Sequence, residues 1–154
     1  DAKVGMIKPE GGVDTKKRIT TISWIPFKDM PEMYKDIEAT MLKANGNHFG
    51  FDGMRLTEVG QFTHYLEGGF YDWHMDNGPN DNTPRKLSLV LQLSNPTEYE
   101  GGDLELMTGC KPEICKKQKG LLYAFPSYVL HRVTPITKGT RRTRVVWIAG
   151  PRFK

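Results

Sequence analysis

The chain has 154 residues, of which 38% are hydrophobic and 26% charged, and its formal net charge is +4. This length and composition predict one globular domain spanning residues 1–154 and exclude a disordered polypeptide. No apolar run approaches the roughly 20 residues of a membrane span, and the first residues lack the apolar core of a secretory signal. We therefore expect no membrane partner and a cytoplasmic location.

The two cysteines and the clusters of basic residues do not indicate a function. Cys110 and Cys115 are too few for a disulfide framework and lack zinc-site spacing, so they are interpreted as ordinary thiols, with a local disulfide as the alternative. Basic residues cluster at 111–119 and 138–144, where a solvated loop and the two faces of a strand explain them. Nucleic acid is therefore not favoured as a partner, and the oligomeric state is left open.

The first predicted elements are a strand over residues 18–27, which is rich in β-branched and aromatic residues, and a helix over about 28–46. Asp29 is the expected N-cap, and Asn45-Gly46 is expected to end the helix. Apolar residues recur on one helical face, which should pack against a sheet: they are Met30, Met33, Ile37 and Met41.

Beyond residue 51 the pattern becomes a series of short strands separated by turn residues, with no second long helix. Such a pattern predicts an antiparallel barrel or sandwich over about residues 58–150, with the helix supporting one outer face. The fold class is thus mainly β with a flanking N-terminal helix. The expected strands cover residues 58–66, 70–75, 86–93, 103–107, 120–125, 131–134 and 142–149.

A candidate metal site combines His74 and Asp76 with the distant His131. In a strand, residues i and i+2 point the same way, so His74 and Asp76 can reach one ion while Met75 faces elsewhere. Two imidazoles and one carboxylate form the facial triad that holds Fe(II) and leaves positions open for a cosubstrate and O2. The pattern indicates an oxygenase.

Arg141 is the candidate anchor for that cosubstrate. The segment after His131 turns through Pro135 and Gly139 and then re-enters a β-rich run, which can bring Arg141 back beside the metal. A guanidinium binds a carboxylate through two parallel hydrogen bonds, so Arg141 suits the distal end of a dicarboxylate. Strand alternation places Arg142 and Arg144 on the opposite face.

These residues resemble the Fe(II)- and 2-oxoglutarate-dependent dioxygenases, and most closely the prolyl 4-hydroxylase-like branch that includes the PKHD-type hydroxylases. The resemblance covers most of residues 58–150. It is carried by residues 65–76 (YLEGGFYDWHMD), 87–93 (LSLVLQL), 99–104 (YEGGDL), 125–127 (FPS) and 131–147.

The resemblance implies a double-stranded β-helix, a jelly-roll or cupin-like barrel. It implies iron ligation by His74, Asp76 and His131, and binding of 2-oxoglutarate by Arg141 with help from Tyr65. The cofactor and cosubstrates would be Fe(II), 2-oxoglutarate and O2, with ascorbate as a further candidate. The implied enzyme hydroxylates an unactivated C–H, with a peptidyl proline in a peptide or protein as the leading substrate, and releases succinate and CO2.

Other interpretations stay open beside this one. The same iron chemistry serves hydroxylases of free amino acids or small molecules and nucleic-acid dealkylases, and a non-catalytic jelly-roll binding module is the non-enzyme alternative. Halogenation is disfavoured because halogenating relatives lack the carboxylate that Asp76 supplies. We interpret Tyr71 and Trp147 as packing residues, and His48 and His64 as lying outside the site. Polar loops at 76–85 and 108–119 are where a peptide could be held.

Overall fold

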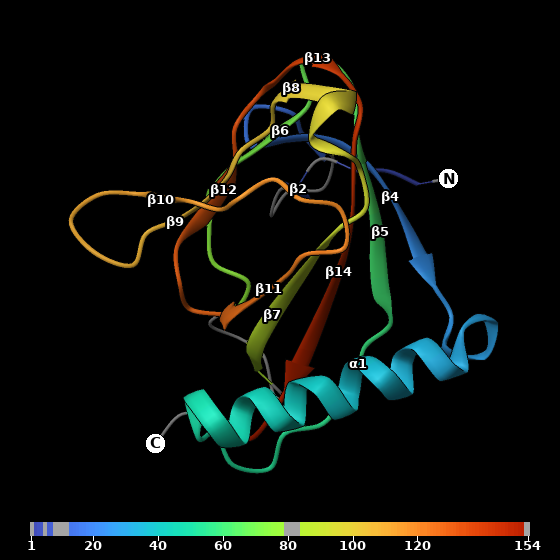
Figure 1. Ribbon diagram of the computed structural model, residues 1–154, viewed down its shortest axis with the longest axis vertical. Helices are drawn as coiled ribbons and strands as arrows, with labels where there is room; N and C mark the ends of the chain where they lie inside the picture. The colour runs from blue at the N-terminus through green and yellow to red at the C-terminus, as the bar shows by residue number, and fades with distance from the viewer. Residues whose placement is uncertain (1, 5, 8–12, 79–83, 153–154) are drawn as a thin grey trace.

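The computed structural model describes residues 2–4, 6–7, 13–78 and 84–152 (Figure 1). Its main feature is a curled antiparallel sheet with the strand order β10-β9-β12-β6-β4-β5-β14-β7-β11, and β1 is added beside β4. These strands are β1 (Ala2–Val4), β4 (Arg18–Ile25), β5 (Gly60–Tyr65), β6 (Phe70–His74), β7 (Arg85–Gln92), β9 (Leu104–Leu106), β10 (Glu113–Ile114), β11 (Leu122–Pro126), β12 (His131–Val133) and β14 (Arg141–Ala149).

The expected strands are confirmed, with ends that differ by a few residues. Shorter strands were missed because two to four residues show no readable alternation. The missed pairs are β2 (Met6–Ile7) with β3 (Val13–Asp14), and β8 (Tyr99–Gly101) with β13 (Ile136–Gly139); β1 and β10 were also missed. Two 3-10 turns, η1 (Phe27–Asp29) and η3 (Pro96–Glu98), complete the elements apart from the helical segment.

The predicted helix is present as α1 (Pro31–Ala44), and its C-cap is Asn45 as predicted, but the predicted N-cap was wrong. Asp29 belongs to η1, and the N-cap is Met30, which makes no side-chain cap. The chain also continues past Asn45 as a π-helical turn, η2 (Asn45–Phe49). The Asn45 amide holds this turn by exchanging two hydrogen bonds with the backbone of Phe51, at 2.8 and 2.9 Å. The α-helix therefore ends where the sequence predicted, and the Asn45 side chain holds one further π-helical turn that the sequence did not predict.

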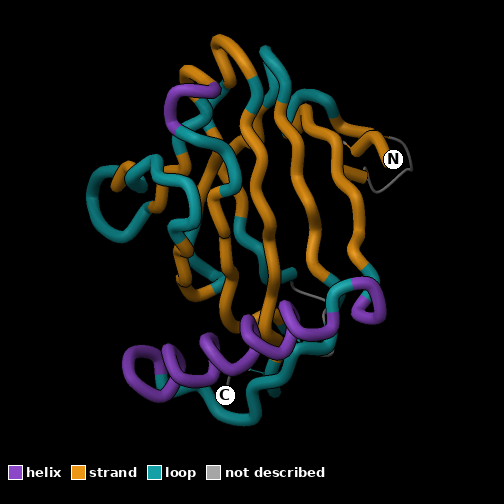
Figure 2. The backbone as a smooth tube through the Cα atoms, turned by 45° about the vertical axis from the view of Figure 1, so that its right-hand side comes forward, coloured by secondary structure: helices purple, strands orange, loops and turns teal. Residues whose placement is uncertain are grey.

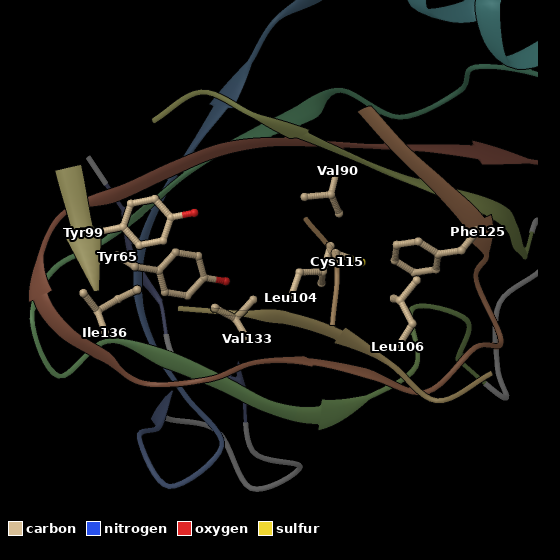
Figure 3. Packing of buried hydrophobic residues seen from close by; sticks show 9 residues of the cluster. All are labelled: Tyr65, Val90, Tyr99, Leu104, Leu106, Cys115, Phe125, Val133 and Ile136. Carbon is tan, nitrogen blue, oxygen red and sulfur yellow. The ribbon is translucent and has the colours of Figure 1, made fainter. Parts of the chain in front are cut away.

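Two apolar clusters lie on opposite faces of the curled sheet. Helix α1 crosses one end of the strands (Figure 2) and packs on the outer face, where Met41 is completely buried beside Leu87 and Ile148. Met30, by contrast, is 40% exposed, so only part of the predicted apolar face is in the core. The inner cluster fills the space that the strands enclose (Figure 3): Tyr65, Val90, Tyr99, Leu104, Leu106, Cys115, Phe125, Val133 and Ile136.

Both clusters draw on the same two strands, which explains why residues 86–90 of β7 and 146–149 of β14 are buried on both faces. Val90 and Val145 face the inner cluster, and Leu89 and Val146 face the outer one. Within the described ranges, none of the helices has the length and hydropathy that crossing a bilayer requires.

Candidate metal centre

The three predicted metal ligands line one pocket. His74 is the last residue of β6, Asp76 lies two residues beyond it, and His131 opens β12 directly opposite His74 in the strand register. The Nε2 atoms of His74 and His131 lie 3.6 and 3.5 Å from the two Asp76 carboxylate oxygens. All three ligand atoms lie within 4.8 Å of one another, so a single ion can reach them.

Both histidines are oriented through their second ring nitrogen. His74 Nδ1 lies 2.7 Å from the carbonyl oxygen of Asp72, and His131 Nδ1 lies 2.9 Å from that of Val129. A carbonyl only accepts, so each Nδ1 carries the proton and donates it. Each Nε2 is then left with a free lone pair, which is the tautomer a metal requires.

Asp76 is held by donors from two strands. Ser88 Oγ donates to its Oδ2 at 2.6 Å, and Trp147 Nε1 donates to the same oxygen at 2.8 Å. Ser88 and Trp147 are register partners on β7 and β14, so one strand pair supplies both donors. Trp147 is therefore more than the packing residue predicted from the sequence, because it orients a candidate ligand.

The electrostatics favour neutral imidazoles beside an ionised carboxylate. Burial, assisted by the neighbouring His131, lowers the pKa of His74 to about 4. Burial opposes ionisation of Asp76, but the two histidines and the Ser88 and Trp147 hydrogen bonds outweigh it and lower the pKa of this carboxyl. A soft-to-borderline divalent cation needs ligands in these protonation states, so the residues present fit Fe(II).

Arg141 lies in the same pocket and is only 1% exposed. Its Cζ is 5.4 Å from the ring centroid of Tyr65, its register partner on β5, and its Nη2 donates to Gln92 Oε1 at 3.3 Å. Its Nε is buried and has no hydrogen-bond partner among the described residues. Gly102 makes room for this side chain, since a Cβ there would lie 3.1 Å from Arg141 Cδ. A buried guanidinium with unused donors is suited to a carboxylate.

The pocket has a volume of about 90 Å³ and brings the triad and Arg141 together with two aromatic residues. Tyr71 stacks on the His74 ring with centroids 3.4 Å apart, so it contacts the site more directly than expected. Burial raises the pKa of Tyr71 to about 12, which keeps its hydroxyl protonated. Figure 3 shows the hydroxyl groups of Tyr65 and Tyr99 pointing into the enclosed space.

Residues predicted to lie outside the site do so. Met75 is exposed beside the triad, and His48 and His64 do not line the pocket. Both cysteines are free thiols: Cys110 is exposed and Cys115 is part of the inner cluster. Residues 79–83 of the predicted 76–85 loop lie outside the described residues.

The comparisons with known proteins agree with this geometry. The model of the 2OG-Fe(II) oxygenase superfamily matches residues 60–149, which is more than half of the chain and includes the triad and Arg141. The chain belongs to the 2OG-Fe(II) oxygenase superfamily. Family membership confirms the resemblance noted in the sequence and supports Fe(II) and 2-oxoglutarate as cofactor and cosubstrate.

Several curated relatives are PKHD-type hydroxylases. One from Teredinibacter turnerae is 35% identical over 132 residues, which cover 80% of this chain and 58% of the relative. Another, from Hyphomonas neptunium, is 45% identical over 86 residues, covering 53% of this chain and 38% of the relative. The chain thus spans about half the length of the curated relatives it matches.

Similar solved structures confirm the jelly-roll fold. A viral collagen prolyl hydroxylase from Paramecium Bursaria Chlorella virus-1, in a 2OG complex, has a TM-score of 0.74 at 22% identity, covering 88% of this chain and 82% of that one. A prolyl hydroxylase from Trichoplax adhaerens, in complex with a hypoxia inducible factor peptide fragment, has a TM-score of 0.76 at 18% identity, covering 96% and 70%. At these identities the likeness establishes the fold alone.

Four residues at the site had no assigned role in the sequence interpretation: Ser88, Gln92 and Arg18, and Trp147 as a donor. Ser88 is a hydroxyl residue between two leucines of β7, and Gln92 is the amide residue that ends the same strand. Polar residues in a buried strand need partners, which is the signal that could have identified them. Arg18 gave no such signal because it is the first residue of β4, and a charged residue at the end of a strand is ordinarily exposed.

Proposed function

We propose that this chain is an Fe(II)- and 2-oxoglutarate-dependent dioxygenase domain that hydroxylates an unactivated C–H, with a peptidyl proline as the leading substrate. The proposal rests on one observation: His74, Asp76 and His131 lie in the same pocket as Arg141, whose buried Nε has no hydrogen-bond partner among the described residues. Because β7 and β14 serve both core clusters, we treat the barrel and its helix as one domain.

In this proposal His74 Nε2, Asp76 and His131 Nε2 hold Fe(II). Asp76 is the asymmetric member, because Ser88 and Trp147 both donate to Oδ2 and leave Oδ1 without a donor among the hydrogen bonds of the described residues. Oδ1 is also the oxygen that lies 3.6 Å from His74 Nε2. The two donors therefore favour a carboxylate that presents one oxygen to the ion and keeps open positions free.

Arg141 would pair with the distal carboxylate of 2-oxoglutarate, with Gln92 holding the guanidinium from the side and the Tyr65 ring lying beside it. Because Arg141 is buried, water does not replace a missing partner. A ligand that lacks the second carboxylate would leave the guanidinium unpaired, so the site favours dicarboxylates. When bound, the iron and cosubstrate supply the oxidative chemistry, in which O2 provides one oxygen atom to succinate and one to the substrate while CO2 leaves.

The protein's own residues supply binding, orientation and exclusion of water. Tyr71, whose hydroxyl stays protonated, lies against His74 and can donate to a substrate carbonyl near the centre. A peptide or protein substrate is supported by the prolyl hydroxylase neighbours, one of which is in complex with a peptide fragment. We retain ascorbate as a candidate reductant for the iron. A hydroxylase of free amino acids is the second candidate, favoured by a further guanidinium in the pocket.

The test is an anaerobic titration with Fe(II) and 2-oxoglutarate, in which the visible metal-to-ligand charge-transfer band is followed for the wild type, His74→Ala and Arg141→Ala. We expect a band in the wild type, none in His74→Ala, and a band in Arg141→Ala that needs far more 2-oxoglutarate. Circular dichroism of each protein provides the folding control. A folded wild type that forms no band would refute the oxygenase function and leave a non-catalytic jelly-roll binding module.

A further inference from the structure

Arg18 is a second buried guanidinium in the pocket of the candidate metal centre. It opens β4, is 8% exposed, and lines the same pocket as His74, Asp76 and Arg141. Its Cζ lies 4.5 Å from the ring centroid of Tyr71, its register partner on β6. Its Nε is buried without a hydrogen-bond partner, and no carboxylate of the described residues forms an ion pair with it.

The Tyr71 ring separates Arg18 from the metal ligands. His74 stacks on this ring with centroids 3.4 Å apart, and the guanidinium lies over it at 4.5 Å. The His74 ring and the Arg18 guanidinium are too close to the Tyr71 ring to share one of its faces, so they lie on opposite faces of that ring. An anion on Arg18 would thus lie beside the metal centre, one ring away from it, and not on the ion itself.

The charges that line the pocket leave Arg18 unmatched. Arg85 is already paired with Glu58, with its Nε 3.0 Å from Oε2, while it stacks on Trp147. In the proposed holoenzyme, the two charges of Fe(II) and the one of Arg141 are balanced by Asp76 and the two carboxylates of 2-oxoglutarate. Among the charged residues that line the pocket, Arg18 is then the one whose charge is not balanced. A buried cation without a partner is energetically costly unless an anion binds to it.

We propose that Arg18 binds a carboxylate of the substrate, so that this enzyme hydroxylates a compound with an anionic group near the reacting C–H. The inference rests on the proposed function and makes its substrate class specific. A carboxylate suits Arg18 because a guanidinium offers two parallel N–H donors. Two sources provide that group: an acidic side chain beside the target residue of a peptide, or the free carboxylate of an amino acid.

The experiment offers both sources, each with a neutral counterpart, to the Fe(II)-loaded protein with 2-oxoglutarate and O2. One pool holds end-blocked proline pentapeptides in which the flanking positions carry Asp, Glu, Asn, Gln, Ala or Lys. The other holds free amino acids, proline included, together with their carboxamides. Products heavier by one oxygen atom are counted by mass spectrometry for the wild type, Arg18→Gln, Arg18→Lys and the control Arg142→Gln.

Arg142 is the matched control because it is an exposed arginine on the same barrel, paired with Glu98 and turned away from the pocket. We expect the wild type and Arg142→Gln to convert the acidic members at least about 30-fold better than their neutral counterparts, as kcat/KM. Arg18→Gln should lose that preference, and Arg18→Lys should keep part of it. Enrichment in the first pool identifies an acidic peptide, and enrichment in the second identifies a free acid.

The charge-transfer band of each variant separates the failures. Equal conversion of acidic and neutral members by the wild type, or a preference that survives in Arg18→Gln, would overturn the role of Arg18. Absence of product from both pools, with the band intact, would also overturn it while leaving the metal and cosubstrate site standing. Absence of the band in folded wild type would overturn the proposed function and this inference together.

Discussion

Replacing Ser88 by alanine removes one of the two donors that hold the Asp76 carboxylate. Ser88 is completely buried, and its Oγ lies 2.6 Å from Asp76 Oδ2 and 2.9 Å from Ser127 Oγ. An ionised carboxylate only accepts, so the single Ser88 proton goes to Asp76, and Ser127 donates to Ser88. The substitution therefore deletes the bond to the carboxylate with almost no change in volume.

The structure sets the expected size of the effect. A hydrogen bond to a charged group contributes about 1.5–3 kcal/mol, which corresponds to about 10- to 150-fold in an equilibrium constant. Loss of a residue that orients a metal ligand costs about 10- to 100-fold in metal affinity, a range that agrees. We therefore expect Ser88→Ala to bind Fe(II) about 10- to 100-fold more weakly, with Trp147 still holding the carboxylate at 2.8 Å.

The assay is an anaerobic Fe(II) titration at saturating 2-oxoglutarate, read from the charge-transfer band. Ser127→Ala is the matched control, because Ser127 is equally buried and belongs to the same hydroxyl pair, yet its side chain does not contact Asp76. It should change the Fe(II) affinity by less than a few-fold. Unchanged affinity in folded Ser88→Ala, or an equal loss in both variants, would refute the reasoning.

Three further results are expected. Because the pKa of His74 is lowered to about 4, the unfolded chain takes up the proton first, and the free energy of unfolding of the metal-free protein should fall as the pH drops from about 6.5 to about 4. His74→Gln should reduce that slope in urea titrations and leave the smaller part that comes from His64, whose pKa is also lowered by burial and by Arg142. Met41→Ala should lower the free energy of unfolding by about 2–5 kcal/mol and leave Fe(II) binding unchanged, since Met41 belongs to the outer cluster. Gly102→Ala should weaken both stability and 2-oxoglutarate binding, because its Cβ would lie 2.2 Å from Ile136 Cδ1 and close to Arg141.

Each of these has a control in the chain. Met30→Ala truncates the methionine at the N-cap of the same helix, which is 40% exposed, so urea unfolding should show a much smaller loss than for Met41→Ala. Gly68→Ala shares a positive φ with Gly102→Ala but opens onto free space, so it isolates the backbone cost. Equal losses within either pair, or a pH slope as steep in His74→Gln as in the wild type, would contradict the corresponding explanation.

The predicted elements and the candidate ligands came from local patterns. The strands from β4 to β14 that are long enough to alternate were predicted, as was α1. His74 and Asp76 were paired because residues two apart share a face, and Met75 is exposed as that argument requires. The predicted N-cap was wrong, since Met30 and not Asp29 holds that position, and the π-helical turn after Ala44 was missed because it depends on two hydrogen bonds between the Asn45 amide and the backbone of Phe51.

What only the tertiary structure decided is the set of contacts made across strands. The direct opposition of His131 and His74 and the pairing of Ser88 with Trp147 depend on strand register. So does the position of Arg18 over Tyr71. Residue types and spacing along one strand follow from the chain alone, since the backbone geometry repeats every two residues. Register between strands far apart in sequence depends on how the whole sheet curls and packs, so the sequence determined which residues could bind a metal, and the fold decided which residues orient them and face the substrate.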